Sequence, residues 1–211
     1  MDKILNKIPL SKGYHNFADK RTYLGIPNFF NVISNIAILI PAIYLITKQK
    51  KKSLLSNLLI IHIILLAIAS TYYHLNPSDD TIFWDIMMIA TTSIIVLIMF
   101  TNHTDFKGLL LYLFGVFSII YWKYEGDLRP YISILIGVPL YIIIKYYKNI
   151  SLRNYIYIII IANILLRLSE HNDHTIYKIT NNQISGHTLK HIFSGIGIFY
   201  VIIMLQKLKK I

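Results

Sequence analysis

The sequence predicts an all-α integral membrane protein, folded as a bundle of seven transmembrane helices. Two observations support this prediction. The composition is 55% apolar with only 15% charged residues, whereas soluble domains average about 25% charged residues. Apolar segments of about 15 to 20 residues also recur along the chain, as they do in multi-pass membrane proteins. The mean hydropathy of +0.54 agrees, and 9 glycines with 0 cysteines exclude collagen-like and disulfide-stapled proteins.

Seven apolar segments are the expected spans. Most have the length that an α-helix needs to cross about 30 Å of hydrocarbon. Because the backbone must satisfy its own hydrogen bonds inside lipid, such segments form helices. We expect a polar N-terminal segment over 1–27, one membrane domain over 28–206 and a short basic tail over 207–211. The spans are predicted at 28–47, 54–73, 81–100, 108–122, 131–147, 154–168 and 188–206.

The placement of basic residues predicts the orientation. Seven spans put the two termini on opposite sides, which we call side A for the N-terminus and side B for the C-terminus. Side A loops are roughly balanced in charge, whereas side B has one acid, Asp105, among its basic residues. The positive-inside rule therefore predicts an extracytoplasmic N-terminus and a cytoplasmic C-terminus, although the basic N-terminal segment argues weakly for the opposite. The basic residues of side B are Lys48, Lys50, Lys51, Lys52, Lys107, Lys145, Lys148, Arg153, Lys207, Lys209 and Lys210.

The net charge of +11 does not predict a nucleic-acid partner. A nucleic-acid-binding protein gathers its Lys and Arg on one face or along one helix. Here the lysines stand in short runs between apolar segments, where membrane proteins keep their orienting charges. We therefore expect a membrane lipid, and no nucleic acid, as the partner of this chain.

Polar and ionisable side chains gather at one end of the expected bundle. The second span ends near Ser70 and His74, the third begins near Asp85, and the last begins near His187 and His191. All of these positions lie at the side A ends of their helices. Ionisable groups at membrane depth are costly and usually mark a functional site.

The spacing of these residues indicates a metal site. Ser70 and His74 are four residues apart, as are His187 and His191, so each pair shares one helix face. Two histidines at this spacing can bind one metal ion. Three histidines with one open position form the usual catalytic zinc arrangement, and a nearby carboxylate such as Asp85 can move protons on the attacking water.

The other histidines have simpler interpretations. A pair of histidines four residues apart at a helix end often lies at the membrane interface without binding a metal. The metal hypothesis therefore depends on the presence of His74 and Asp85 at the same end of the bundle. His62, midway along the second span, is expected to be a packed or hydrogen-bonded core residue, and His103 lies on side B. His171 and His174 are rival ligands on side A, but their loop context favours a solvated position.

As a set, these motifs resemble the alkaline ceramidase family of the CREST group of seven-span membrane metal hydrolases. The likeness follows the order of the spans over essentially the whole chain, and the stretch before the first span resembles the bacterial ceramidase-like branch. The stretches that carry it are Tyr14-His15-Asn16-Phe17-Ala18-Asp19-Lys20-Arg21, Tyr72-Tyr73-His74-Leu75-Asn76-Pro77 and Ser185-Gly186-His187-Thr188-Leu189-Lys190-His191.

The resemblance implies roles for five residues. His74, His187 and His191 would bind Zn²⁺, Asp85 would be the acid/base group, and Ser70 would help to hold the tetrahedral oxyanion. The implied reaction is hydrolysis of the amide of an N-acyl sphingoid base, such as ceramide, to a fatty acid and a free amine. The protein would then belong to sphingolipid metabolism.

The chain departs from the family in two places. Eukaryotic members carry several acids before the first span that form a Ca²⁺ site, whereas here the matching stretch has only Asp19, with Asn16 and Asn28 as neutral oxygen donors. Calcium is therefore not expected, and Asp19 and Asn28 are at most secondary site residues. The residues after Asp85 are Ile86-Met87-Met88 instead of the proline–methionine pair common in the family.

Two other classes of function compete with the hydrolase. One is a seven-span receptor or sensor that keeps a structural metal site and hydrolyses nothing. The other is a haem-binding or metal-transporting bundle, which would place facing histidines or ionisable groups near the midplane. The crowding of these groups at one face favours a hydrolase or a structural site.

Overall fold

The computed structural model describes residues 6–49 and 53–211, which are helical over most of their length. Lys50, Lys51 and Lys52 of the predicted basic loop, and the first residues of the N-terminal segment, lie outside this part of the chain. The helices are α1 (Phe29–Ile33), α2 (Ile36–Lys48), α3 (Leu54–Leu75), α4 (Asp79–Thr101), α5 (Phe106–Glu125), α6 (Arg129–Tyr146), α7 (Arg153–His171), α8 (Asp173–Ile179) and α9 (Gly186–Lys207).

The all-helical prediction is confirmed, and each predicted span coincides with a helical segment. Six segments among the described residues are long and apolar enough to cross a membrane: α1 together with α2, and α3, α4, α5, α6 and α9. α7 has a comparable length of 19 residues but is less apolar, because it carries charged and amide side chains. The short helix α8 in the last side A loop was not predicted.

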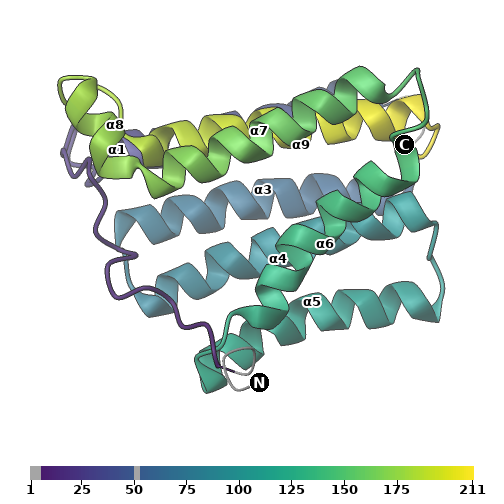
Figure 1. Cartoon of the computed structure of the whole chain (residues 1–211), viewed down its shortest axis with the longest axis horizontal. Helices are drawn as coiled ribbons and strands as arrows, with labels where there is room; N and C mark the ends of the chain where they lie inside the picture. Colours follow the sequence, from purple (N-terminus) through teal and green to yellow (C-terminus); the bar gives the residue numbers. More distant parts are fainter. Residues whose placement is uncertain (1–5, 50–52) are drawn as a thin grey trace.

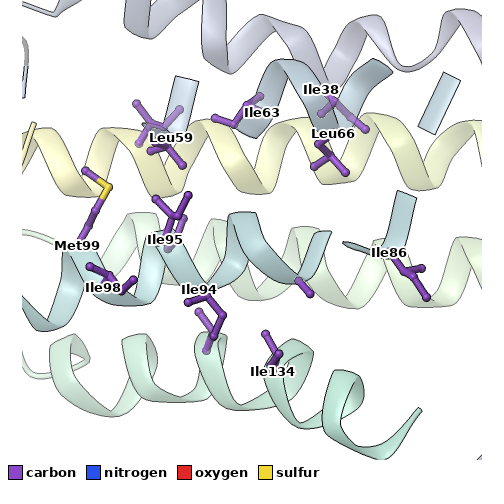
Figure 2. Packing of buried hydrophobic residues seen from close by; sticks show 14 of the residues in the cluster. Ile38, Leu59, Ile63, Leu66, Ile86, Ile94, Ile95, Ile98, Met99 and Ile134 are labelled. Carbon is purple, nitrogen blue, oxygen red and sulfur yellow. The ribbon is translucent and has the colours of Figure 1, made fainter. Parts of the chain in front are cut away.

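Polarity is distributed as in a protein surrounded by lipid. Large apolar side chains such as Ile43, Leu113 and Ile164 are exposed on the outside, whereas His74 and Asp85 are buried. Six apolar helices with this arrangement indicate a membrane protein. The centre is nonetheless well packed: Figure 2 shows side chains of α2, α3, α4 and α6 that meet there, including Leu66 and Ile94.

The helices pack around a central space. α7 lies along α9, α9 along α2, α2 along α3, α3 along α4, and α4 along α5. α6 crosses the bundle obliquely and packs on α4 and α5, but it touches α7 only sparsely (Figure 1). The helices therefore form an almost closed ring. Within this ring, the packing between α6 and α7 is the sparsest.

The first span is interrupted, and the interruption matters for the site. α1 ends at Ile33 and α2 begins at Ile36, so that Ser34 lies in a turn between them. Further along, Pro41 has no N–H to donate to the Ala37 carbonyl. Gly195 of α9 packs against this carbonyl, so closely that a Cβ atom on Gly195 would lie 2.2 Å from the Ala37 oxygen. The glycine lets α2 and α9 approach each other near His191.

We expect Gly195→Ala to destabilise the fold, because the new methyl group forces α2 and α9 apart. Overpacking of this kind costs about 1–3 kcal/mol. Thermal unfolding of the purified protein in detergent measures the effect, with Gly137→Ala in α6 as the matched control, since a Cβ there meets nothing within 4 Å. Equal melting temperatures for the two variants would contradict the close approach of α2 and α9.

Candidate metal centre

Three buried histidines from two helices meet at the side A end of the bundle. His74 is on the last turn of α3, and His187 and His191 are on the first two turns of α9. One ligand atom from each ring lies within 4.8 Å of the others, and all three residues are buried. The structure therefore brings together the three predicted ligands, and the group can hold a metal ion.

The spacing of one pair of ring nitrogens fits a small tetrahedral ion. The Nε2 atoms of His74 and His191 are 3.2 Å apart, whereas Zn–N bonds of 2.0–2.1 Å at the tetrahedral angle place two nitrogens about 3.3 Å apart. His74 Nδ1 and His187 Nε2 are buried without a hydrogen-bond partner among the described residues. Buried polar atoms normally have a partner, and an ion on the three rings would provide one for His187.

Ser34 orients His191. The Ser34 hydroxyl donates to the Asn31 carbonyl at 3.0 Å and lies 2.7 Å from His191 Nδ1. Because the hydroxyl hydrogen is already used, this network assigns the Nδ1 hydrogen to His191, which donates it to Ser34. The lone pair of His191 Nε2 then faces the other two rings. Metal-binding histidines usually have such a partner for their second nitrogen.

Helix ends are held in place on both sides of the histidines. Asn28 donates from Nδ2 to the His74 carbonyl at 2.9 Å, which satisfies a backbone group at the end of α3. Asp173 accepts from the His187 amide at 2.7 Å and from the Ala18 amide at 2.8 Å. Its carboxylate thus lies at the positive end of the α9 dipole and ties the N-terminal segment to it.

The N-terminal segment covers the histidines on side A. Phe17 is 3% exposed, and its ring centroid lies 4.8 Å from that of His74 and 4.6 Å from that of His187. His15 lies between the Tyr73 hydroxyl, at 2.9 Å, and Asp79, at 3.0 Å. The segment therefore separates the metal centre from the solution on side A by an aromatic layer.

Asp85 and Ser70 lie beside the histidines but outside the ligand group. Both are buried, and the two side chains lie close enough to interact. Asp85 Oδ1 has no hydrogen-bond partner among the described residues. Both side chains line the same cavity as His191. Asp85 therefore lines the cavity while one of its carboxylate oxygens is buried without a partner in the described part of the chain.

The cavity has a polar end and a long apolar part. Its volume is about 380 Å³, which lies in the usual range for small-molecule sites. The α4 side of its lining runs from Asp85 to Val96, roughly 16 Å at 1.5 Å per residue. Apolar residues such as Leu135 and Ile198 line the part that is remote from the histidines. The shape and polarity suit a molecule with a polar group and an alkyl chain.

The structure also locates the secondary residues. Both carboxylate oxygens of Asp19 accept from Arg21, at 2.9 and 2.6 Å, and this bonding raises the pKa of the Arg21 guanidinium above its ordinary value. A cation at Asp19 would have to compete with that guanidinium. Asn28 faces the His74 carbonyl as described above, and neither residue belongs to the three-histidine group.

The histidines expected elsewhere are where the sequence placed them. His62 is buried and hydrogen-bonded to the Leu58 carbonyl at 2.8 Å and to the Tyr112 hydroxyl at 3.1 Å, as predicted for a core histidine. His171 and His174 are exposed and outside the metal group. The rival ligand set is therefore not assembled in this structure.

Sequence reasoning did not assign a role to Ser34, Phe17 or Asp173. Ser34 and Phe17 lie in or near the motif-rich N-terminal stretch, but nothing in their spacing shows that they contact α3 or α9. Asp173 follows the predicted span 154–168 in a side A loop, but it is buried and bonded to the start of α9. The burial of Asp173 next to the N-terminus of α9 is recognisable only in the tertiary structure.

We expect Ser34→Ala to weaken metal binding by about 10–100-fold, as loss of an outer-shell partner usually does, while the fold is kept. A competition titration of zinc against a chromophoric chelator measures the affinity. Ser93→Ala is the control, because the Ser93 hydroxyl donates to its own helix at the Ile89 carbonyl. Unchanged zinc affinity in Ser34→Ala would refute its role in orienting His191.

Comparison of the chain with known protein families and with curated proteins finds no match to either. The family resemblance therefore depends on the motif residues alone.

Proposed function

We propose that this protein is a zinc-dependent intramembrane hydrolase that cleaves the amide bond of an N-acyl, ceramide-like lipid, with the architecture of the alkaline ceramidase family. One observation carries the proposal: three buried histidines converge, and one of them, His191, lines a mainly apolar cavity together with Asp85 and Ser70. An alkyl chain fits along the apolar part, which leaves the amide at the histidines.

His74, His187 and His191 are the proposed zinc ligands. Zn²⁺ bound there would polarise the amide carbonyl and make a water a better nucleophile at neutral pH. Three uncharged imidazoles leave most of the positive charge of the ion for that purpose and keep one position open. Ser34 and the aromatic layer of Phe17 hold the rings in position and keep solution from side A away from them.

Asp85 is the proposed proton carrier. Its carboxylate accepts a proton from the attacking water as the water oxygen bonds to the amide carbon. When the carbon–nitrogen bond breaks, Asp85 gives the proton to the leaving nitrogen, so that the products are a fatty acid and a free amine. Ser70 keeps Asp85 oriented and can donate to the oxygen that gains negative charge.

We further propose that α7 is a seventh span, with the N-terminus extracytoplasmic and the C-terminus cytoplasmic. α7 packs along α9 over much of its length, and the loops at the C-terminal end of the bundle carry the excess of basic residues. The metal centre would then lie near the extracytoplasmic surface.

A receptor or sensor with a structural metal site is the alternative. One feature favours it: the histidines join α3 to α9, so that an ion would cross-link the two helices whether or not hydrolysis occurs. The two functions differ in what Asp85 does, because a structural site has no need of a free carboxylate in the cavity.

We expect Asp85→Asn to keep its zinc and to lose amide hydrolysis by about 100-fold or more, the usual contribution of a general acid/base. His191→Ala should lose both. Metal analysis of the purified variants and release of fatty acid from a panel of N-acyl lipids, chosen by comparing lipids of cells with and without the protein, measure the two properties.

Three results would count against this scheme. Unchanged zinc in His191→Ala overturns the ligand assignment. Full activity in Asp85→Asn overturns the proton-transfer role. A zinc-loaded wild-type protein that hydrolyses no N-acyl lipid supports the receptor alternative.

The chain has 0 cysteines, so an introduced cysteine is a unique label for topology. Ile150 and Ile179 flank α7 and are 79% and 72% exposed. We expect an impermeant thiol reagent applied to intact cells to label Ile179→Cys but not Ile150→Cys, and inverted vesicles to give the opposite result. Labelling of both positions from one side would show that α7 does not span the membrane.

A further inference from the structure

α7 owes its weak apolar character to a polar stripe on one face. Asn163, Arg167 and Glu170 follow one another by four and then three residues, the spacing of a single helix face. All three line the cavity, whereas Ile164 and Leu168 of the same helix are exposed on the outside. Asn163 and Arg167 lie within the predicted span 154–168, where polar groups are costly unless they serve a site, so this stripe calls for a ligand.

The stripe continues into a charge cluster at the polar end of the cavity. Glu170 Oε1 accepts from Lys190 at 2.6 Å and from the Tyr14 hydroxyl at 3.1 Å. Burial raises the pKa of Tyr14 well above its ordinary value, so its hydroxyl remains a donor. Glu170 thus faces two cations, Lys190 and Arg167, while Lys190 also faces Asp85.

Of these two cations, Arg167 uses the smaller share of its hydrogen-bond donors. Its Nη1 reaches Glu170 Oε2 at 3.4 Å, the long limit of a hydrogen bond, and no other hydrogen bond of this side chain occurs among residues 6–49 and 53–211. Its side chain is 54% exposed, whereas that of Lys190 is 13% exposed. A guanidinium has five N–H donors in a planar fork that matches a carboxylate or a phosphate.

The cluster adjoins the proposed reaction centre. Lys190 immediately precedes the ligand His191, and Lys190, Arg167 and Asp85 all line one cavity. A lipid whose amide lies at the histidines and whose chain follows the apolar wall would therefore have its head group near Arg167 and Lys190. A divalent ion on the three histidines would add to the positive charge there, while Asp85 and Glu170 are the acids that oppose it.

We propose that Arg167, supported by Lys190, binds an anionic head group, so that the preferred substrate is an N-acyl lipid with a carboxylate or phosphate next to its amide and not a neutral ceramide. This inference deepens the proposed function and rests on it for the position of the amide. Glu170 and Tyr14 hold Lys190 at the back of the subsite, and Arg167 provides the fork that contacts the anion.

Direct binding tests the proposal without requiring turnover. Three probes with the same chain, N-palmitoylglycine, the phosphate ester of N-palmitoylethanolamine and neutral N-palmitoylethanolamine, are titrated into the purified zinc-loaded protein in the Asp85→Asn background. We expect at least tenfold tighter binding of one or both anionic probes than of the neutral probe. Which of the two binds better identifies the anion as carboxylate or phosphate.

Arg167→Gln should abolish this preference and leave the affinity for the neutral probe unchanged, and Arg167→Lys should restore part of it. Arg153→Gln, at the other end of the same helix and outside the cavity lining, is the matched control and should bind like the parent. Equal binding of all three probes by the parent, or equal losses for charged and neutral probes in Arg167→Gln, would overturn the anion subsite.

The failure of this inference is distinguishable from failure of the hydrolase. A preference for anionic probes that depends on Arg167 supports the subsite even if the wild type hydrolyses none of the three. Hydrolysis of neutral N-acyl lipids with no anion preference in binding keeps the hydrolase and removes the subsite.

Discussion

The meeting of His74 on α3 with His187 and His191 on α9 is the contact on which the rest of the site depends. This contact requires that α3 ends and α9 begins at the same depth in the bundle, although the two helices are far apart in the chain. Gly195 permits the close approach of α2 to α9, and the turn at Ser34 puts a hydroxyl next to His191. Asn28 and Asp173 bond to the backbone of the histidine-bearing helix ends. Local changes at these residues are therefore expected to affect the metal centre.

Around this contact the protein separates two environments. The N-terminal segment places Phe17 over the histidine rings and joins Tyr14 to Glu170, which covers the site on side A. On the other side the site continues into a cavity that is apolar over most of its length. In the proposed hydrolase, a lipid substrate would enter this site from the membrane and not from solution.

In the proposed hydrolase, charge inside the cavity would provide the selectivity that shape alone lacks. An apolar channel accepts many alkyl chains, because one methylene more or less changes binding little. A partly buried ion pair such as Glu170–Lys190, with Arg167 beside it, would discriminate between head groups more strongly, since an unmatched charge in a poorly solvated site is costly. The choice of substrate would thus be made at the head group, next to the bond that is cleaved.

The sequence by itself determined the helical class, the positions of the helices and the candidate ligands, because hydropathy and the spacing of His187 from His191 are local properties of one helix. It also placed His62 in the core. Only the tertiary structure decided that Ser34 orients His191, that Phe17 covers the rings and that Arg167 faces the cavity with Lys190. These are contacts between segments far apart in the chain. Their existence depends on how helices rotate and tilt against one another, which hydropathy does not encode.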